Sequence, residues 1–175
     1  MNTKNMAALG AYSERLVQYY FESKGSKVQK SSSMYDDKKD ILIDGASTEV
    51  KFQTIYYNFK SYDRSEPYMA FTVPIITGDS NKVAQNQLMK CVNVERWIIV
   101  QNPAKPNERT IKIWEAPPLG QRKFKIIQNS KDKRITAGFP LSDFKLLVDI
   151  DNKAIFKKIK DLQFSKWGNY SKQNV

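Results

Sequence analysis

The chain has no histidine and a single cysteine among its 175 residues. The missing histidine excludes Ser-His-Asp and Cys-His catalysis, histidine-ligated zinc, and the nucleases that use a histidine as general base. Cys91 alone cannot build a disulfide framework, which favours a reducing compartment. Any hydrolytic chemistry in this chain therefore has to rely on carboxylates, lysine and a hard metal ion.

Long apolar segments are also missing. No run approaches the roughly 20 residues that a membrane-spanning helix needs. The short apolar stretch at residues 6–9 soon meets Glu14 and Arg15, so the N-terminus does not resemble a signal peptide. We therefore expect a cytoplasmic protein without a membrane partner. Its frequent lysine and asparagine are compatible with a phage or mobile element, in which case the cytoplasm is that of the host.

Acidic side chains are scarce relative to basic ones. The chain has 29 Lys and Arg against 18 Asp and Glu, a net charge of +11. Residues 1–120 hold 16 basic and 13 acidic side chains, whereas residues 121–175 hold 13 and 5. Such a surplus favours a polyanionic partner, and we predict DNA, with RNA not excluded. The basic residues expected at phosphates, unless they form an ordinary solvated face, are Lys38, Lys39, Arg122, Lys123, Lys125, Lys131, Lys133 and Arg134.

The spacing of apolar residues predicts a mixed α/β fold. Three- and four-residue steps predict a first helix over residues 5–24, with Gly25 just after its end. Strands are predicted over 27–30, 40–43, 48–53, 69–73, 96–100 and 110–114, helices over 81–93, 142–147 and 152–164, and a Lys-rich hairpin over 122–135. We expect one sheet of about four to six strands flanked by helices. Residues 1–116 would form the core, and 117–175 a basic extension packed on it as one domain.

An Asp-Gly pair between two apolar runs predicts a tight β-hairpin at residues 40–53. Both central residues of a two-residue hairpin turn need positive φ, which Asp44 and Gly45 tolerate. In such a turn Ile43 pairs with Ala46. The register of every later pair in the hairpin follows from that one.

This register brings three charged side chains to one face. Asp40 is expected opposite Glu49, and Lys51 lies two residues further along on the same face. With a four-residue loop, Asp40 would lie opposite Lys51 instead and still share the face. Two adjacent carboxylates repel each other unless a cation lies between them. Lys51 or a Mg²⁺ ion can supply that charge, and the Val50 carbonyl could be a further metal ligand.

Asp40 followed by Glu49-Val50-Lys51 resembles the signature of the PD-(D/E)xK nucleases. This superfamily includes restriction enzymes, Holliday-junction resolvases and homing endonucleases. The resemblance covers about residues 7–101, and the rest of the chain has no counterpart in it. It implies a restriction-endonuclease-like mixed sheet and hydrolysis of DNA phosphodiester bonds with Mg²⁺ or Mn²⁺.

Two further features fit this family and two depart from it, of which the first is the gap of nine positions between Asp40 and Glu49, at the short end for its members. Gly10 and Glu14 match the G-x-x-x-E element on the first helix of many members, where the helix glutamate joins the metal site. Gln53, two residues after the lysine, recurs in several branches. Lys39 precedes Asp40, where the name of the motif has proline, although that proline is often missing.

The resemblance thus implies a complete set of roles for an endonuclease. Lys51 would orient the attacking water and the phosphate, and Gln53 would make a supporting contact. The metal ligands would be Glu14, Asp40, Glu49 and the Val50 carbonyl. A homing or restriction-like enzyme and a structure-selective resolvase both fit, as does exonuclease action. A homodimer would supply the two active sites that cleavage of both strands needs.

Each assignment has an alternative. Glu14 could form a solvated ion pair, and an acidic residue at 36–37 could be the ligand in place of Asp40. Glu49 and Lys51 could form an exposed ion pair, and Gln53 could be structural. The chain as a whole could be a non-catalytic nucleic-acid-binding module, or a protein-interaction factor with a basic patch.

Overall fold

The structure is a computed structural model that describes residues 3–30, 40–53, 55–56, 68–74, 93–101, 111–122, 125–128 and 134–164. Its helices are α1 (Thr3–Ser23) and α3 (Lys153–Phe164), with short 3₁₀ turns η1 (Leu119–Gln121) and η2 (Leu141–Asp143). Its strands are β1 (Val28–Lys30), β2 (Ile41–Ile43), β3 (Ala46–Gln53), β4 (Ile55–Tyr56), β5 (Tyr68–Pro74), β6 (Arg96–Gln101), β7 (Ile111–Glu115), β8 (Lys125–Gln128), β9 (Arg134–Pro140) and β10 (Lys145–Ile150).

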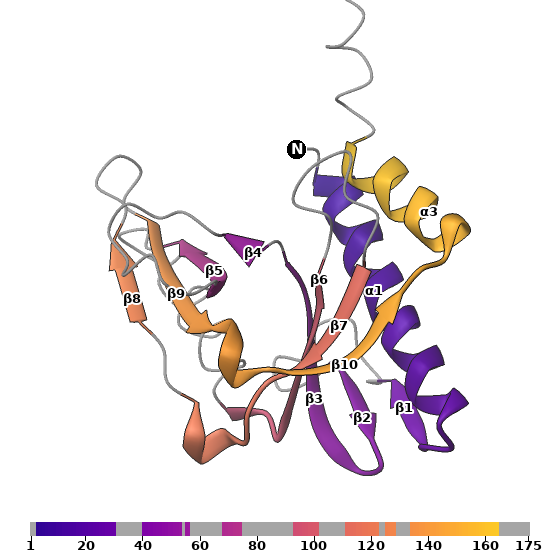
Figure 1. The fold of residues 1–175 in the computed structure, drawn as a ribbon, viewed down its shortest axis with the longest axis horizontal. Coiled ribbons are helices and arrows are strands. Elements are labelled where there is room, and N and C mark those ends of the chain that lie inside the picture. The colour runs from indigo at the N-terminus through magenta and orange to yellow at the C-terminus, as the bar shows by residue number, and fades with distance from the viewer. Residues whose placement is uncertain are drawn as a thin grey trace, which may run out of the picture.

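The main sheet has six strands in the order β1-β2-β3-β6-β7-β10. Strands β3 and β6 pair in parallel, whereas the other neighbours in this sheet are antiparallel. Both α1 and α3 lie along one face of the sheet (Figure 1). The predicted α/β class and mixed sheet of about four to six strands are confirmed.

The hairpin between β2 and β3 has the predicted two-residue turn. Asp44 and Gly45 have φ of 52° and 86°, the two positive values that this turn needs. Ile43 pairs with Ala46, so the register is the predicted one and the four-residue loop is excluded. The Lys27 N–H donates to Asp44 Oδ1 at 2.8 Å and holds the pKa of that carboxyl below its usual value.

The end of α1 also follows the prediction from sequence. Gly25 has φ of 86°, a conformation that glycine adopts without strain. Its N–H donates to the Glu22 carbonyl and the Ser26 N–H to the Phe21 carbonyl, the two bonds of a Schellman motif. This cap turns the chain directly into β1.

Two apolar clusters cover the two faces of the main sheet. The cluster on the helical face joins Leu9, Leu16, Val17 and Phe21 of α1 and Ile159 of α3 to Ile41, Ile43, Val50, Ile98, Val100, Ile111 and Ile113 of the sheet. The opposite cluster contains Val94, Trp97, Ile99, Ala116, Phe139 and Phe144. Phe139 comes from β9, and its ring lies 4.7 Å from that of Trp97. The main sheet is thus attached to β9 on the face away from the helices.

A second sheet of four strands, in the order β4-β5-β9-β8, was not predicted (Figure 1). Its strands come from both sides of residue 117, and the main sheet likewise includes β10. The division into 1–116 and 117–175 stays a prediction. The predicted hairpin at 122–135 corresponds to β8 and the start of β9, which pair antiparallel.

One predicted helix is wrong. Residues 142–147 lie instead in the turn η2 and in β10, which completes the edge of the main sheet against β7. Short apolar runs do not distinguish helix from strand by spacing, and pairing with an open edge decides here. Of the predicted helix 81–93, only Asn93 lies within the described residues. In the described part of the chain, no helix has the length and apolar character to cross a lipid bilayer.

The backbone conformation at Gly45, in the hairpin turn, and at Gly10, in α1, predicts opposite effects of an alanine substitution on stability. Gly45→Ala should lower the free energy of unfolding by about 1–2 kcal/mol, because its positive φ strains any residue with a Cβ. Gly10→Ala, in the middle of α1 with open space around the added Cβ, should raise it by about 0.5–1 kcal/mol. Urea unfolding followed by circular dichroism measures both. A Gly45→Ala variant as stable as the parent would contradict the role given to this turn.

Candidate functional site

Asp40 lies directly before β2 and is joined to β3 by two hydrogen bonds. Its N–H donates to the Thr48 carbonyl at 3.0 Å, and its Oδ2 accepts from the Val50 N–H at 2.8 Å. Continuing the observed register by one pair places Asp40 opposite Glu49. The carboxylate is therefore held at the hairpin by the backbone of the neighbouring strand.

Glu49 and Lys51 form an ion pair along one side of β3. Lys51 Nζ contacts Glu49 Oε1, and the Glu49 side chain is completely buried. The Lys51 side chain is 26% exposed, so the pair is open to solvent at the lysine. The exposed Glu49–Lys51 ion pair named as an alternative from sequence thus differs from the observed pair, because the acid lies inside the protein.

The three charged groups lie on the face of the main sheet that the helices do not cover. Glu49 pairs with Trp97 and Lys51 with Ile99, and paired residues of parallel strands project to the same side. Trp97 and Ile99 belong to the cluster on the face away from the helices. Val50 projects the other way, into the helical cluster. The site thus belongs to the side on which β9 is attached.

Glu14 is half-buried on α1, which packs on the Val50 side of β3. Among the described residues, no three Asp, Glu or Cys side chains gather into a group that could hold a metal ion. The structure therefore brings Asp40 to Glu49 but does not unite both with Glu14 in one such group. The alternative acids at 36–37 lie outside the described residues.

The donor set at the hairpin nevertheless suits a hard divalent cation. Mg²⁺ is commonly held by one or two carboxylates, with water and substrate phosphate completing its shell. Asp40 and Glu49 supply that number, and the Val50 carbonyl is an oxygen of the right kind. The bond from the Val50 N–H orients Asp40 and uses one of about four acceptor positions on a carboxylate.

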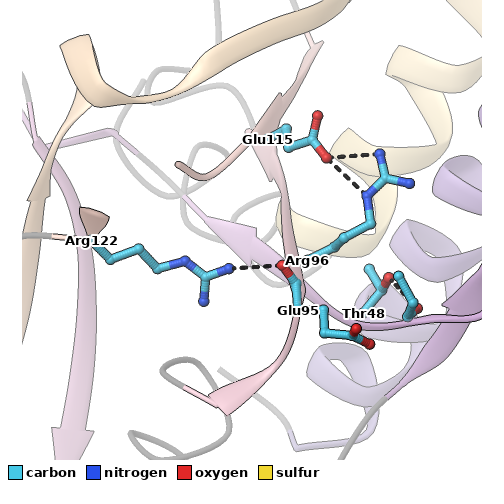
Figure 2. Close-up of polar contacts among 6 residues, drawn as sticks. Thr48, Glu95, Arg96, Glu115 and Arg122 are labelled. Carbon is cyan, nitrogen blue, oxygen red and sulfur yellow. Dashed lines mark hydrogen bonds and ion pairs between the residues drawn. The ribbon is translucent and has the colours of Figure 1, made fainter. Parts of the chain in front are cut away.

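Glu95, just before β6, and Arg96, its first residue, hold the strands around the site in register. The N–H and hydroxyl of Ser47 donate to Glu95 Oε2 at 2.7 and 3.1 Å, and these bonds lower the pKa of Glu95. Arg96 donates to Glu115 Oε1 from Nε and Nη2, at 2.9 and 2.7 Å (Figure 2). The first contact ties β6 to β3 and the second ties β6 to β7.

Arg122, predicted to contact phosphate, makes contacts within the protein. Its Nε donates to the Pro117 carbonyl at 2.8 Å and its Nη2 to the Glu95 carbonyl at 3.4 Å (Figure 2). The guanidinium also lies 5.9 Å from the centre of the Trp97 ring. These contacts brace the segment after β7 against the start of β6.

The other predicted phosphate contacts cannot be placed in the site. Lys125 lies in β8 and Arg134 in β9 of the second sheet, and their side chains are not among those described. The remaining ones lie outside the described residues: Lys38, Lys39, Lys123, Lys131 and Lys133.

No family model, curated protein or solved structure matches this chain. The case for a function therefore rests on the geometry of the site. Its central feature is a buried acid, a lysine and a second acid gathered at one hairpin of a basic protein.

Sequence reasoning overlooked Gln101, the last residue of β6. Its side chain is 7% exposed, and its Oε1 accepts from the Trp114 indole N–H at 2.8 Å. Register places it beside Gln53, a predicted site residue whose side chain is not described, on the face of Lys51. A glutamine directly after the apolar run 97–100 is the signal that could have identified it.

The buried ion pair predicts strongly non-additive effects on stability. Lys51→Met should lower the free energy of unfolding by roughly 3 kcal/mol, because it leaves the Glu49 charge buried without its lysine. Glu49→Gln/Lys51→Met should recover most of that loss, because no uncompensated charge is left. Urea unfolding at neutral pH of the parent, both single variants and the double variant measures the coupling. Additive effects would show that the pair is not electrostatically coupled.

Proposed function

We propose that this protein is a Mg²⁺- or Mn²⁺-dependent nuclease of the PD-(D/E)xK kind that hydrolyses DNA phosphodiester bonds. One observation carries the proposal: a completely buried Glu49 is paired with Lys51 where the hairpin register sets Asp40 beside it. That combination holds two carboxylates and an amine on one sheet face.

The buried Glu49–Lys51 pair with Asp40 beside it is not expected to stabilise the folded protein. Removing two charges from water costs several kcal/mol per ion, and apolar residues of similar volume often serve a fold as well or better. A second carboxylate next to the pair adds repulsion. Charged groups held together at such a cost are frequent at functional sites, which favours a catalytic role for this group.

The proposed roles follow from the chemistry of each group. Asp40 and Glu49 would hold the metal ion with the Val50 carbonyl, and Glu14 is proposed as a further ligand. A bound metal ion lowers the pKa of water and stabilises charge on the phosphate. Lys51, partly open to solvent, would donate to the attacking water or to a phosphate oxygen. Gln53 would make a supporting contact.

The order of elements supports a restriction-endonuclease-like fold. A helix precedes a hairpin that carries the acids, and β6 then pairs in parallel with the strand bearing Glu49 and Lys51. The net charge of +11 supports a polyanionic substrate. We further propose that the enzyme acts in the cytoplasm on duplex or branched DNA, as a homodimer where two strands are cut.

Nicking of supercoiled plasmid tests the proposal. The parent protein should nick it with Mg²⁺ or Mn²⁺ and not with EDTA. Asp40→Asn, Glu49→Gln and Lys51→Met should each reduce the rate by about 100-fold or more, the loss usual for a group that stabilises the transition state. Circular dichroism at the assay temperature verifies that each variant is folded.

The role of Glu14 is tested by comparing its substitution with that of a second glutamate on α1. Mg²⁺ should raise the melting temperature of the parent, and Glu14→Gln should reduce both this rise and the rate of nicking. Glu22→Gln, an exposed glutamate on α1, is the matched control and should change neither. If the parent neither cleaves plasmid, branched DNA or RNA nor is stabilised by Mg²⁺ or Mn²⁺, the proposal is wrong and a non-catalytic binding module is favoured.

A further inference from the structure

A line of polar side chains continues from the hairpin across the main sheet. Register aligns Gln101 of β6 with Lys112 of β7 and Lys112 with Asp149 of β10, and Gln101 itself pairs with position 53 of β3, two residues after Lys51. Directly paired residues of neighbouring strands project to the same face. The line therefore lies on the face that carries Lys51, at the carboxyl end of the parallel pair β3 and β6.

The carboxamide of Gln101 has a defined orientation. An indole N–H is only a donor, so its partner in Gln101 has to be the oxygen. The two arms of a carboxamide diverge, and the amide nitrogen therefore points away from Trp114. Gln101 thus directs two N–H donors from a side chain that is more than nine-tenths buried. Such an anchored donor is suited to bind an anion.

Lys112 adds a positive charge next to this donor. Its side chain is 29% exposed, and its Nζ lies 3.6 Å from Asp149 Oδ2, a loose and exposed ion pair. An exposed pair of this kind contributes little stability, so its lysine can exchange partners at small cost. Gln101 and Lys112 are directly paired across β6 and β7, so a carboxamide donor and a lysine leave the same face of the sheet at adjacent positions.

We propose that Gln101 and Lys112 form a second phosphate subsite, which binds the nucleic-acid backbone beside the phosphate held at Lys51. The inference rests on the proposed function, because it takes the ligand to be the same DNA strand. Gln101 is a diagonal neighbour of Lys51, and such neighbours lie roughly 7–8 Å apart. Phosphates follow one another at about 3.4 Å along the axis of one strand, so a strand can reach both positions.

Binding of a short fluorescein-labelled duplex DNA in EDTA, followed by anisotropy, tests Gln101 without any cleavage. Gln101→Met should weaken binding about tenfold or more, as expected for the loss of a hydrogen bond to a charged group. It should also lower the melting temperature, because the Trp114 N–H loses its acceptor. Gln101→Met/Trp114→Phe removes both partners, so its melting temperature should recover while its affinity stays low. Recovery of both would overturn the subsite and leave Gln101 a structural partner of Trp114.

Lys112 is tested by the salt dependence of the same binding. Lys112→Gln should reduce the slope of log affinity against log salt by about 0.9, the value for one phosphate contact. Lys157→Gln removes the same charge from an exposed position on α3, on the helical face, and should leave the slope unchanged. Equal slopes for both variants and the parent would overturn the contact at Lys112.

Failure of the subsite and failure of the proposed function give different results. A parent that nicks plasmid while the Gln101 and Lys112 variants bind like it overturns the subsite alone. A parent that binds DNA through these residues but nicks nothing with Mg²⁺ or Mn²⁺ supports the subsite and overturns catalysis. A parent that does not bind DNA overturns both.

Discussion

The arrangement of the site depends on the register of a single hairpin. Two residues with positive φ, Asp44 and Gly45, set the pairing of β2 with β3. A shift of one residue would move every side chain of a strand to the other face. Glu49 and Lys51 would then enter the helical cluster, and Val50 would leave it. The same backbone choice thus determines both the apolar core and the position of the charged groups.

Local signals were enough to predict this part of the molecule. The Asp-Gly turn, the Gly25 cap and the start of α3 each involve residues close together in the chain. At the start of α3, Asn152 Oδ1 accepts from the N–H groups of Ala154 and Ile155. The hairpin register followed from the turn by counting. The proximity of Asp40, Glu49 and Lys51 was therefore predictable without knowledge of the rest of the fold.

What the sequence could not predict depends on distant partners. Residues 145–150 form a strand because they pair with the edge of β7, and no local sequence pattern indicates that edge. The second sheet joins β5 to β9, segments far apart in the chain. In the sequence, Arg122 is indistinguishable from the other basic residues near it. In the structure its guanidinium contacts the Pro117 and Glu95 carbonyls and the Trp97 ring. The orientation of the Gln101 side chain likewise depends on a residue of another strand, Trp114, whose indole N–H donates to it.

The packing of α1 against β10 and α3 has a consequence for how the chain folds. The hydrogen bond from the Tyr20 hydroxyl to the Leu147 carbonyl closes a separation of 127 residues, and Ile159 of α3 fills the core beneath α1. Contacts between such distant segments slow folding, because the entropy of closing long loops is lost before they form. Until β10 and α3 arrive, the apolar stripe of α1 stays partly uncovered. Apolar surface exposed in a partly folded chain favours aggregation.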